Sequence, residues 1–113
     1  MKESVLVVLT NPVSPDQDDA FNDWYDRVHV PDVLKVQGFS AARRYRVSDV
    51  QLAGTGGDHR YLALYELETD DLAGACEALG KAASDGSMEL HEALDMAKVQ
   101  SLLFEAIGPR QTA

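Results

Sequence analysis

The chain has 113 residues, of which 45% are hydrophobic and 26% charged, and its formal net charge at pH 7 is −9. We expect one globular domain over residues 1–113, with a core of modest size. The negative charge argues against nucleic-acid and membrane partners, because polyphosphates and anionic lipids repel an acidic surface. The apolar run at residues 5–9 is too short to span a membrane or to form a signal sequence. A single cysteine, Cys76, allows no internal disulfide and fits a reducing, cytoplasmic setting.

A strand and a long helix are predicted first along the chain. Residues 4–10 are apolar or β-branched at consecutive positions, which is typical of a central strand buried on both faces. Ser14-Pro15-Asp16 is a helix start, with proline at the first helical position. We expect this helix to run to about Val36 and to end at Gly38. Pro31 is expected to kink the helix or to end its regular part, because it lacks a backbone N–H.

Two strands joined by a flexible loop come next. Residues 39–47 predict a strand that alternates between two faces. One face carries Phe39, Ala41, Arg43, Tyr45 and Val47, and the other carries Ser40, Ala42, Arg44 and Arg46. The glycine-rich residues 48–59 predict a hairpin loop. Residues 60–67 predict a third strand, with Tyr61, Ala63, Tyr65 and Leu67 on one face.

The last third of the chain completes a recognisable order of elements. Thr69-Asp70-Asp71 is expected to cap a helix over about residues 72–83. Residues 87–96 predict a short helical turn, and residues 98–107 predict a fourth strand. The order β-α-β-β-α-β is the split βαβ arrangement, so we expect an α+β, ferredoxin-like fold. Its four-stranded antiparallel sheet has the first and third strands in the centre.

Two helices cover only one face of such a sheet, and the other face is also expected to be apolar. Residues 5–9 are apolar on both faces, and residues 102–104 are Leu, Leu and Phe. An apolar face left in water needs a partner. We therefore predict a homodimer in which two sheets pack face to face.

The chain resembles the dimeric α/β-barrel superfamily, in its EthD-like branch. The resemblance rests on the strand order and on Phe21–Asp26 (FNDWYD), His29–Val33 (HVPDV), Gly38-Phe39 and Arg43–Tyr45 (RRY). It implies a homodimeric α/β barrel with a pocket between helices and sheet. Superfamily members include polyketide cyclases, monooxygenases without metal or flavin, lactone isomerases, haem enzymes and proteins of no known activity, so the fold implies little about chemistry.

His29 is the leading catalytic candidate, and it matches the histidine of the branch's His-x-Pro motif. A titratable ring beside aromatic side chains suits a general acid or base of near-neutral pKa, which removes a proton alpha to a carbonyl or protonates an enolate. Asp26 and Asp32, three residues away on either side, would orient the imidazole or raise its pKa. The branch often has an apolar residue at the position of Asp32. Alternatively, the imidazole hydrogen-bonds a backbone carbonyl and holds the helix end.

The strands supply the other candidate residues. Tyr45 and Tyr65 would polarise a substrate carbonyl if they face the helices, or else they are packing residues. Arg43 either binds a carboxylate or phenolate or, as the commoner use, pairs with the acidic first helix. Arg44 and Arg46 are expected in solvent or at the dimer edge. The candidate ligand contacts are Trp24, Phe21, Arg43, Tyr61 and Phe104.

These observations predict a cofactor-independent small-molecule enzyme. It would carry out cyclase, isomerase or dehydratase chemistry on a hydrophobic, carbonyl-bearing, aromatic or polyketide-like compound. No cofactor and no metal are expected, since metal-binding spacings are absent and haem ligation by His91 has no other support. The alternative is a non-catalytic ligand-binding or accessory protein of an oxidative degradation or biosynthetic system. A third interpretation is a cofactor-independent monooxygenase.

Overall fold

A four-stranded antiparallel sheet organises the computed structural model, which describes residues 2–113. Its strands are β1 (Lys2–Thr10), β2 (Phe39–Arg46), β3 (Tyr61–Thr69) and β4 (Gln100–Glu105). The strand order is β2-β3-β1-β4, which places β1 and β3 in the centre as predicted. The predicted α+β, ferredoxin-like fold is confirmed.

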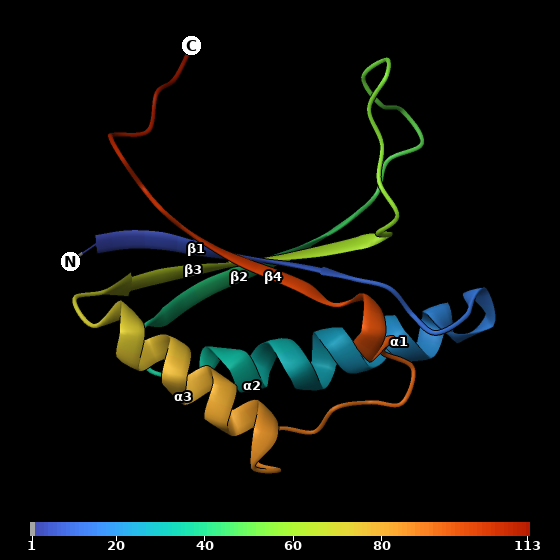
Figure 1. Cartoon of the computed structure of the whole chain (residues 1–113), viewed down its shortest axis with the longest axis horizontal. Helices are drawn as coiled ribbons and strands as arrows, with labels where there is room; N and C mark the ends of the chain where they lie inside the picture. Colours follow the sequence, from blue (N-terminus) through green and yellow to red (C-terminus); the bar gives the residue numbers. More distant parts are fainter. Residues whose placement is uncertain (1) are drawn as a thin grey trace.

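All the helices lie on one side of the sheet (Figure 1). The predicted first helix is a succession of short segments: η1 (Pro15–Gln17), α1 (Asp18–Trp24), the π-helical η2 (Tyr25–His29) and α2 (Val30–Leu34). The wide π turn comes just before Pro31, and the Val30 N–H reaches back five residues to the Tyr25 carbonyl. Pro31 has no N–H and crowds the carbonyl four residues earlier, so a wider turn lets the helix continue past it.

The second half matches the prediction except between the last helix and the last strand. α3 spans Leu72–Ser84, and the Asp71 side chain caps it by accepting from the Gly74 N–H. The helical turn predicted at residues 87–96 is wrong, because this segment pairs with the loop after β1. The Val13 N–H donates to the Ala93 carbonyl at 2.8 Å, and Pro12 forms a bridge with Leu94. A short helix, η3, follows at Met96–Lys98.

A β-bulge at Ser40 changes which residues of β2 face the helices. Phe39 lies opposite Leu67, whereas Ala41 already lies opposite Glu66, so Ser40 is an extra residue. The predicted uniform alternation through residues 39–47 is therefore wrong. Beyond the bulge, Ala42, Arg44 and Arg46 pair with Tyr65, Ala63 and Tyr61. Ala41, Arg43 and Tyr45 point to the face without helices.

The core fills the space between the helices and the sheet. Its largest fully buried side chains are Tyr25, Tyr65, Phe21, Leu67 and Val33. The sheet face without helices, here called the open sheet face, carries Val5, Val7 and Leu9 of β1, Leu62 and Leu64 of β3, Leu102 and Phe104 of β4, and Arg43 and Tyr45 of β2. Leu102 is 45% exposed and Phe104 is 52% exposed. Within residues 2–113, every helix is too short or too polar to cross a lipid bilayer.

Candidate functional site

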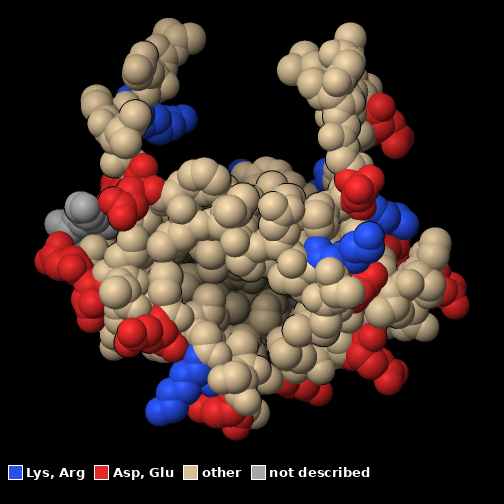
Figure 2. All heavy atoms as spheres, viewed as in Figure 1, with Lys and Arg blue, Asp and Glu red and all other residues tan. Residues whose placement is uncertain are grey.

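A pocket of about 170 Å³ lies between the helices and the central strands. Apolar side chains from β1, α2, α3 and residues 88–99 form most of its wall. Five polar residues also line it, namely Thr10, Tyr25, His29, Tyr65 and Ser101. Figure 2 shows a hollow bordered by uncharged side chains in the middle of the molecule. This hollow lies between the helices and the sheet.

Strand alternation and helix spacing bring the polar groups of this pocket together. Thr10 follows Leu6 and Val8 on the helix-facing side of β1, and Tyr65 lies directly opposite Leu6 on β3. Tyr25 and His29 are four residues apart on η2, so both side chains project from one face of the helix. The sequence-predicted residues His29 and Tyr65 thus meet at one pocket.

Three residues of this wall each have a buried polar atom without a hydrogen-bond partner: Thr10 Oγ1, His29 Nδ1 and Tyr65 Oη. Most buried polar groups in folded proteins are hydrogen-bonded, so each exception calls for an explanation. The Tyr25 hydroxyl lies beside the hydroxyls of Tyr65 and Thr10, although neither contact completes a hydrogen bond for these two residues. Burial raises the pKa of both phenols, so each stays protonated at neutral pH and is able to donate.

His29 is held between two aromatic rings. Its imidazole stacks on Trp24 with ring centres 4.8 Å apart and meets the edge of Tyr25 at 5.0 Å. The pKa of His29 is lowered to about 4, mainly by burial; the negative charge of Asp32 acts in the opposite direction, and the positive charge of Arg44 adds a smaller lowering effect. The predicted near-neutral pKa is wrong, because desolvation outweighs the neighbouring carboxylate. His29 is a neutral imidazole at pH 7.

The sequence did not predict that Thr10 and Tyr25 line the pocket, or that Arg44 is turned toward the helices beside it. Arg44 Nη1 pairs with Asp26 Oδ1 at 2.9 Å, and its Nη2 donates to Asn22 Oδ1 at 2.7 Å. The guanidinium lies 4.3 Å from the centre of the Tyr25 ring, and the side chain is only 13% exposed. Arg44 therefore makes the ion pair with the first helix that was expected of Arg43, because the bulge turns it toward the helices. No sequence signal marks the bulge, since Ser40 is an ordinary strand residue.

Trp24, Phe21 and Tyr61 support the site from the core and do not line the pocket. Trp24 Nε1 donates to the Glu89 carbonyl at 3.1 Å, which ties the first helix to the segment after α3. Phe21 is completely buried and contacts the rings of Trp24, Tyr25 and Tyr61. The Tyr61 hydroxyl accepts from Asn22 Nδ2 at 3.1 Å, so it belongs to the Arg44 network.

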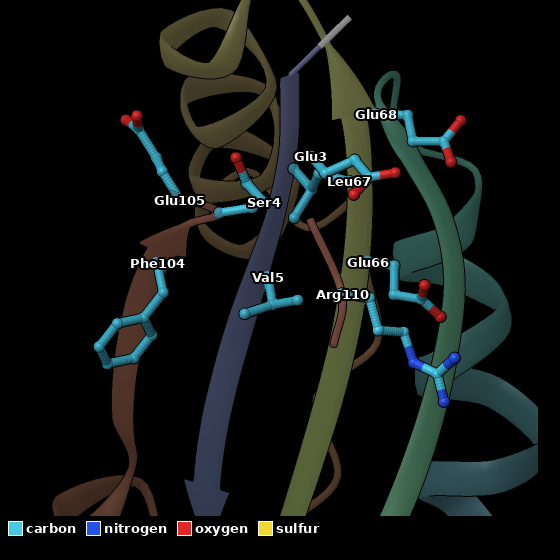
Figure 3. A pocket seen from close by; sticks show the side chains of 10 residues that line it. Glu3, Ser4, Val5, Glu66, Leu67, Glu68, Phe104, Glu105 and Arg110 are labelled. Carbon is cyan, nitrogen blue, oxygen red and sulfur yellow. The ribbon is translucent and has the colours of Figure 1, made fainter. Parts of the chain in front are cut away.

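Tyr45, Arg43 and Phe104 lie on the open sheet face, on the other side of the sheet from His29. Phe104 borders a separate hollow of about 410 Å³ there, together with Glu3, Glu66 and Arg110 (Figure 3). The structure therefore separates these three residues from the pocket. Among residues 2–113, no three His, Cys, Asp or Glu side chains are grouped to hold a metal ion. The His91 imidazole accepts from the Ala93 N–H through Nδ1 at 2.9 Å.

Comparison with protein families finds one match, to the family described as "Domain of unknown function (DUF4286)", over residues 5–75. This match covers more than half of the chain. No curated protein matches it.

Several solved structures share the fold. An EthD family protein from Bacillus halodurans is 18% identical, with a TM-score of 0.59 over 95% of this chain and 100% of the other. The haem degrader MhuD of Mycobacterium tuberculosis, solved with two haems in its active site, is 15% identical, with a TM-score of 0.61 over 96% and 99%. A dimeric ferredoxin-like protein from an uncultured marine organism is 13% identical, with a TM-score of 0.61 over 97% and 100%. At these identities the likeness concerns the fold, and there it confirms the predicted resemblance to EthD-like, dimeric ferredoxin-like proteins.

Proposed function

We propose that this chain, which belongs to the DUF4286 family, binds a small apolar carbonyl compound in the pocket beside His29 and acts on it by acid–base chemistry without a cofactor. One observation carries the proposal. His29 and Tyr65 both line one mainly apolar pocket, and His29 Nδ1 and Tyr65 Oη are both buried without a hydrogen-bond partner. A base and a hydrogen-bond donor beside one mainly apolar pocket are the two groups that enolate chemistry needs.

The proposed roles follow from the protonation states. The neutral imidazole of His29 takes the proton alpha to the substrate carbonyl. The protonated hydroxyl of Tyr65 donates to the carbonyl oxygen and stabilises the enolate that forms. The apolar walls strengthen both interactions by excluding water. Return of the proton at another atom gives an isomerase, attack of the enolate on a second carbonyl gives a cyclase, and loss of a β-hydroxyl gives a dehydratase.

A non-catalytic binding or accessory protein is the second candidate function, and the pKa of His29 is the observation that favours it. An imidazole with a pKa of about 4 is a weak base at pH 7. In this alternative, His29, Tyr65 and Thr10 orient a ligand by hydrogen bonds and no bond changes. The third interpretation, a cofactor-independent monooxygenase, requires turnover that depends on oxygen.

We also propose that the chain is a homodimer formed through the open sheet face. Large apolar side chains are exposed there, which is unusual for a monomer. The loop between β2 and β3 and the C-terminal segment both extend beyond this face, away from the helices (Figure 1). Val50 and Leu52 of that loop and Ile107 of that segment are almost fully exposed. Two sheets packed face to face would bury the central patch, and these extensions would flank the partner.

Hydrogen–deuterium exchange alpha to a carbonyl tests the enzyme proposal without knowledge of the natural substrate. We expect the protein to accelerate exchange of the benzylic protons of phenylacetone in D2O, followed by NMR. His29→Ala should slow the catalysed exchange by about 10²- to 10⁴-fold, because the base is lost. Tyr65→Phe should slow it by about 10²-fold or more, because the donor to the enolate oxygen is lost.

Two further measurements make this experiment decisive. His59→Ala serves as the matched control, because His59 is partly exposed and bonds only the Lys98 carbonyl. Trp24 is the only tryptophan and stacks on His29, so its fluorescence reports binding in the same samples. Binding without accelerated exchange favours the non-catalytic alternative. Full exchange activity in folded His29→Ala refutes the assignment of His29.

A further inference from the structure

The proposed function names a small apolar carbonyl compound, and the pocket wall restricts the charge, size and polar groups of that ligand further. We infer that the pocket selects uncharged molecules of about one aromatic ring that carry a hydrogen-bond donor and an acceptor at one end. This inference rests on the proposed binding function, because it concerns the same pocket.

The first step concerns charge at the wall. None of the lining residues is Lys, Arg, Asp or Glu, so no formal charge touches the cavity. The polar lining groups are two hydroxyl side chains, two phenols and an imidazole. An ion moved from water into such a cavity loses its hydration and gains no counter-charge, which strongly disfavours its binding.

The second step is that the two charged residues that act on His29 already have partners elsewhere. Arg44 is held by Asp26 and Asn22, and its guanidinium lies against the Tyr25 ring. Asp32 pairs with Lys35 at 3.5 Å. Neither residue lines the pocket, so neither becomes a counter-ion without breaking its present contacts. The discrimination therefore applies to anions and cations alike.

The third step concerns size and hydrogen bonding. The cavity of about 170 Å³ is close to the ~150 Å³ of an engineered apolar cavity that holds benzene in another protein. A single ring with one short substituent matches this space. His29 in its neutral form accepts at one ring nitrogen, and Tyr65 and Thr10 each bring a hydroxyl donor to the pocket lining. A primary amide, a phenol or a hydroxy-carbonyl group satisfies both needs, whereas haem lies outside this class in size and in charge.

Two isosteric probe pairs test the inference at pH 7. Benzamide and benzoate have nearly the same shape but differ by one negative charge. Benzyl alcohol and benzylamine differ in the same way by one positive charge. Titration followed by Trp24 fluorescence and calorimetry should give an affinity for each neutral probe at least about 30-fold higher than for its charged partner, given the cost of burying an unpaired ion.

A variant that blocks the pocket locates the binding. Ala83 lines the pocket and is exposed, so Ala83→Leu narrows the entrance without disturbing the core. It should reduce benzamide affinity at least about tenfold, since the added side chain occupies the ligand's space. Ala73→Leu, at an exposed position of α3 outside the pocket, is the matched control and should leave the affinity unchanged.

The possible outcomes distinguish a failure of the charge selection from a failure of the proposed binding function. If benzoate or benzylamine binds within threefold of its neutral partner and Ala83→Leu weakens that binding, the charge selection is overturned and the binding function stands. If neither neutral probe binds at millimolar concentration, the binding function and the inference fall together. Strong neutral binding that Ala83→Leu abolishes supports both.

Discussion

His29 illustrates how packing, more than sequence neighbours, sets the chemistry of a residue. Two carboxylates three residues away suggested a raised pKa. In the fold, Asp26 is paired with Arg44, and burial against Trp24 and Tyr25 outweighs the remaining effect of Asp32. The motif was enough to single out His29 as a candidate site residue. The protonation state of His29 could not be predicted from it, because desolvation depends on side chains that come from several elements.

The lowered pKa of His29 predicts a loss of stability in mild acid. The pKa of His29 is about 4 in the folded protein, whereas an ordinary histidine, as in the unfolded chain, has a pKa of 6.5. The unfolded state therefore binds a proton first as the pH falls. This contribution to stability is complete above pH 6.5 and is lost between pH 6.5 and 4. We expect about 2 kcal/mol less stability from this residue at pH 5 than at pH 7.

Urea unfolding of the native protein and of His29→Gln at both pH values measures this effect. The variant should lack this part of the pH dependence, because glutamine does not titrate. An equal loss of stability in the variant and the native protein would show that His29 is not the source.

At the scale of elements, two irregularities place the groups of the site, and they differ in how visible they are in the sequence. The π turn at Tyr25–His29 lies beside Pro31, whose effect on the helix was expected. The bulge at Ser40 has no such marker, yet it determines that Arg44 faces the helices and Arg43 does not. A bulge arises from how two strands fit together, which the residues of one strand do not specify.

Gly38 joins α2 to β2 and offers a test at this scale. Its φ is +90°, and an added Cβ would lie 3.2 Å from Ala75 Cβ and 3.3 Å from Thr69 Cβ. Gly38→Ala should therefore destabilise the protein by about 1–3 kcal/mol.

Gly80→Ala is the matched control for this change. Gly80 lies inside α3 with open space around it, so alanine there should stabilise the protein by up to about 1 kcal/mol. Thermal and urea unfolding measure both variants. A neutral Gly38→Ala would contradict the strain at this connection.

At the scale of the whole molecule, the sheet is covered on one face only. The helices and the segment after α3 bury one side, while β4 leaves Leu102 and Phe104 exposed on the other. This imbalance was foreseeable, because β1 is apolar on both faces and two helices are too few to cover both. The partner that covers the open sheet face remains our proposal of a second copy.

Phe104→Glu tests that proposal. A charge on the proposed sheet-to-sheet interface should raise the dimer dissociation constant by about tenfold or more, since it replaces an aromatic side chain that the dimer would bury. Sedimentation over a dilution series measures the change. Ala73→Glu, on the helix side of the molecule, should leave the dimer intact. A native protein that is monomeric at high concentration would overturn the proposal.

The amino-acid sequence by itself determined the order of elements, the central position of β1 and β3, the apolar open face and the prominence of His29. These features depend on local periodicity and on spacing along the chain, and both are properties of the residue order alone. Only the tertiary structure decided that Tyr25, Thr10 and Tyr65 share a pocket with His29, that Arg44 replaces Arg43, and that the imidazole is neutral. Those outcomes depend on register and burial, which exist only after distant segments have packed together.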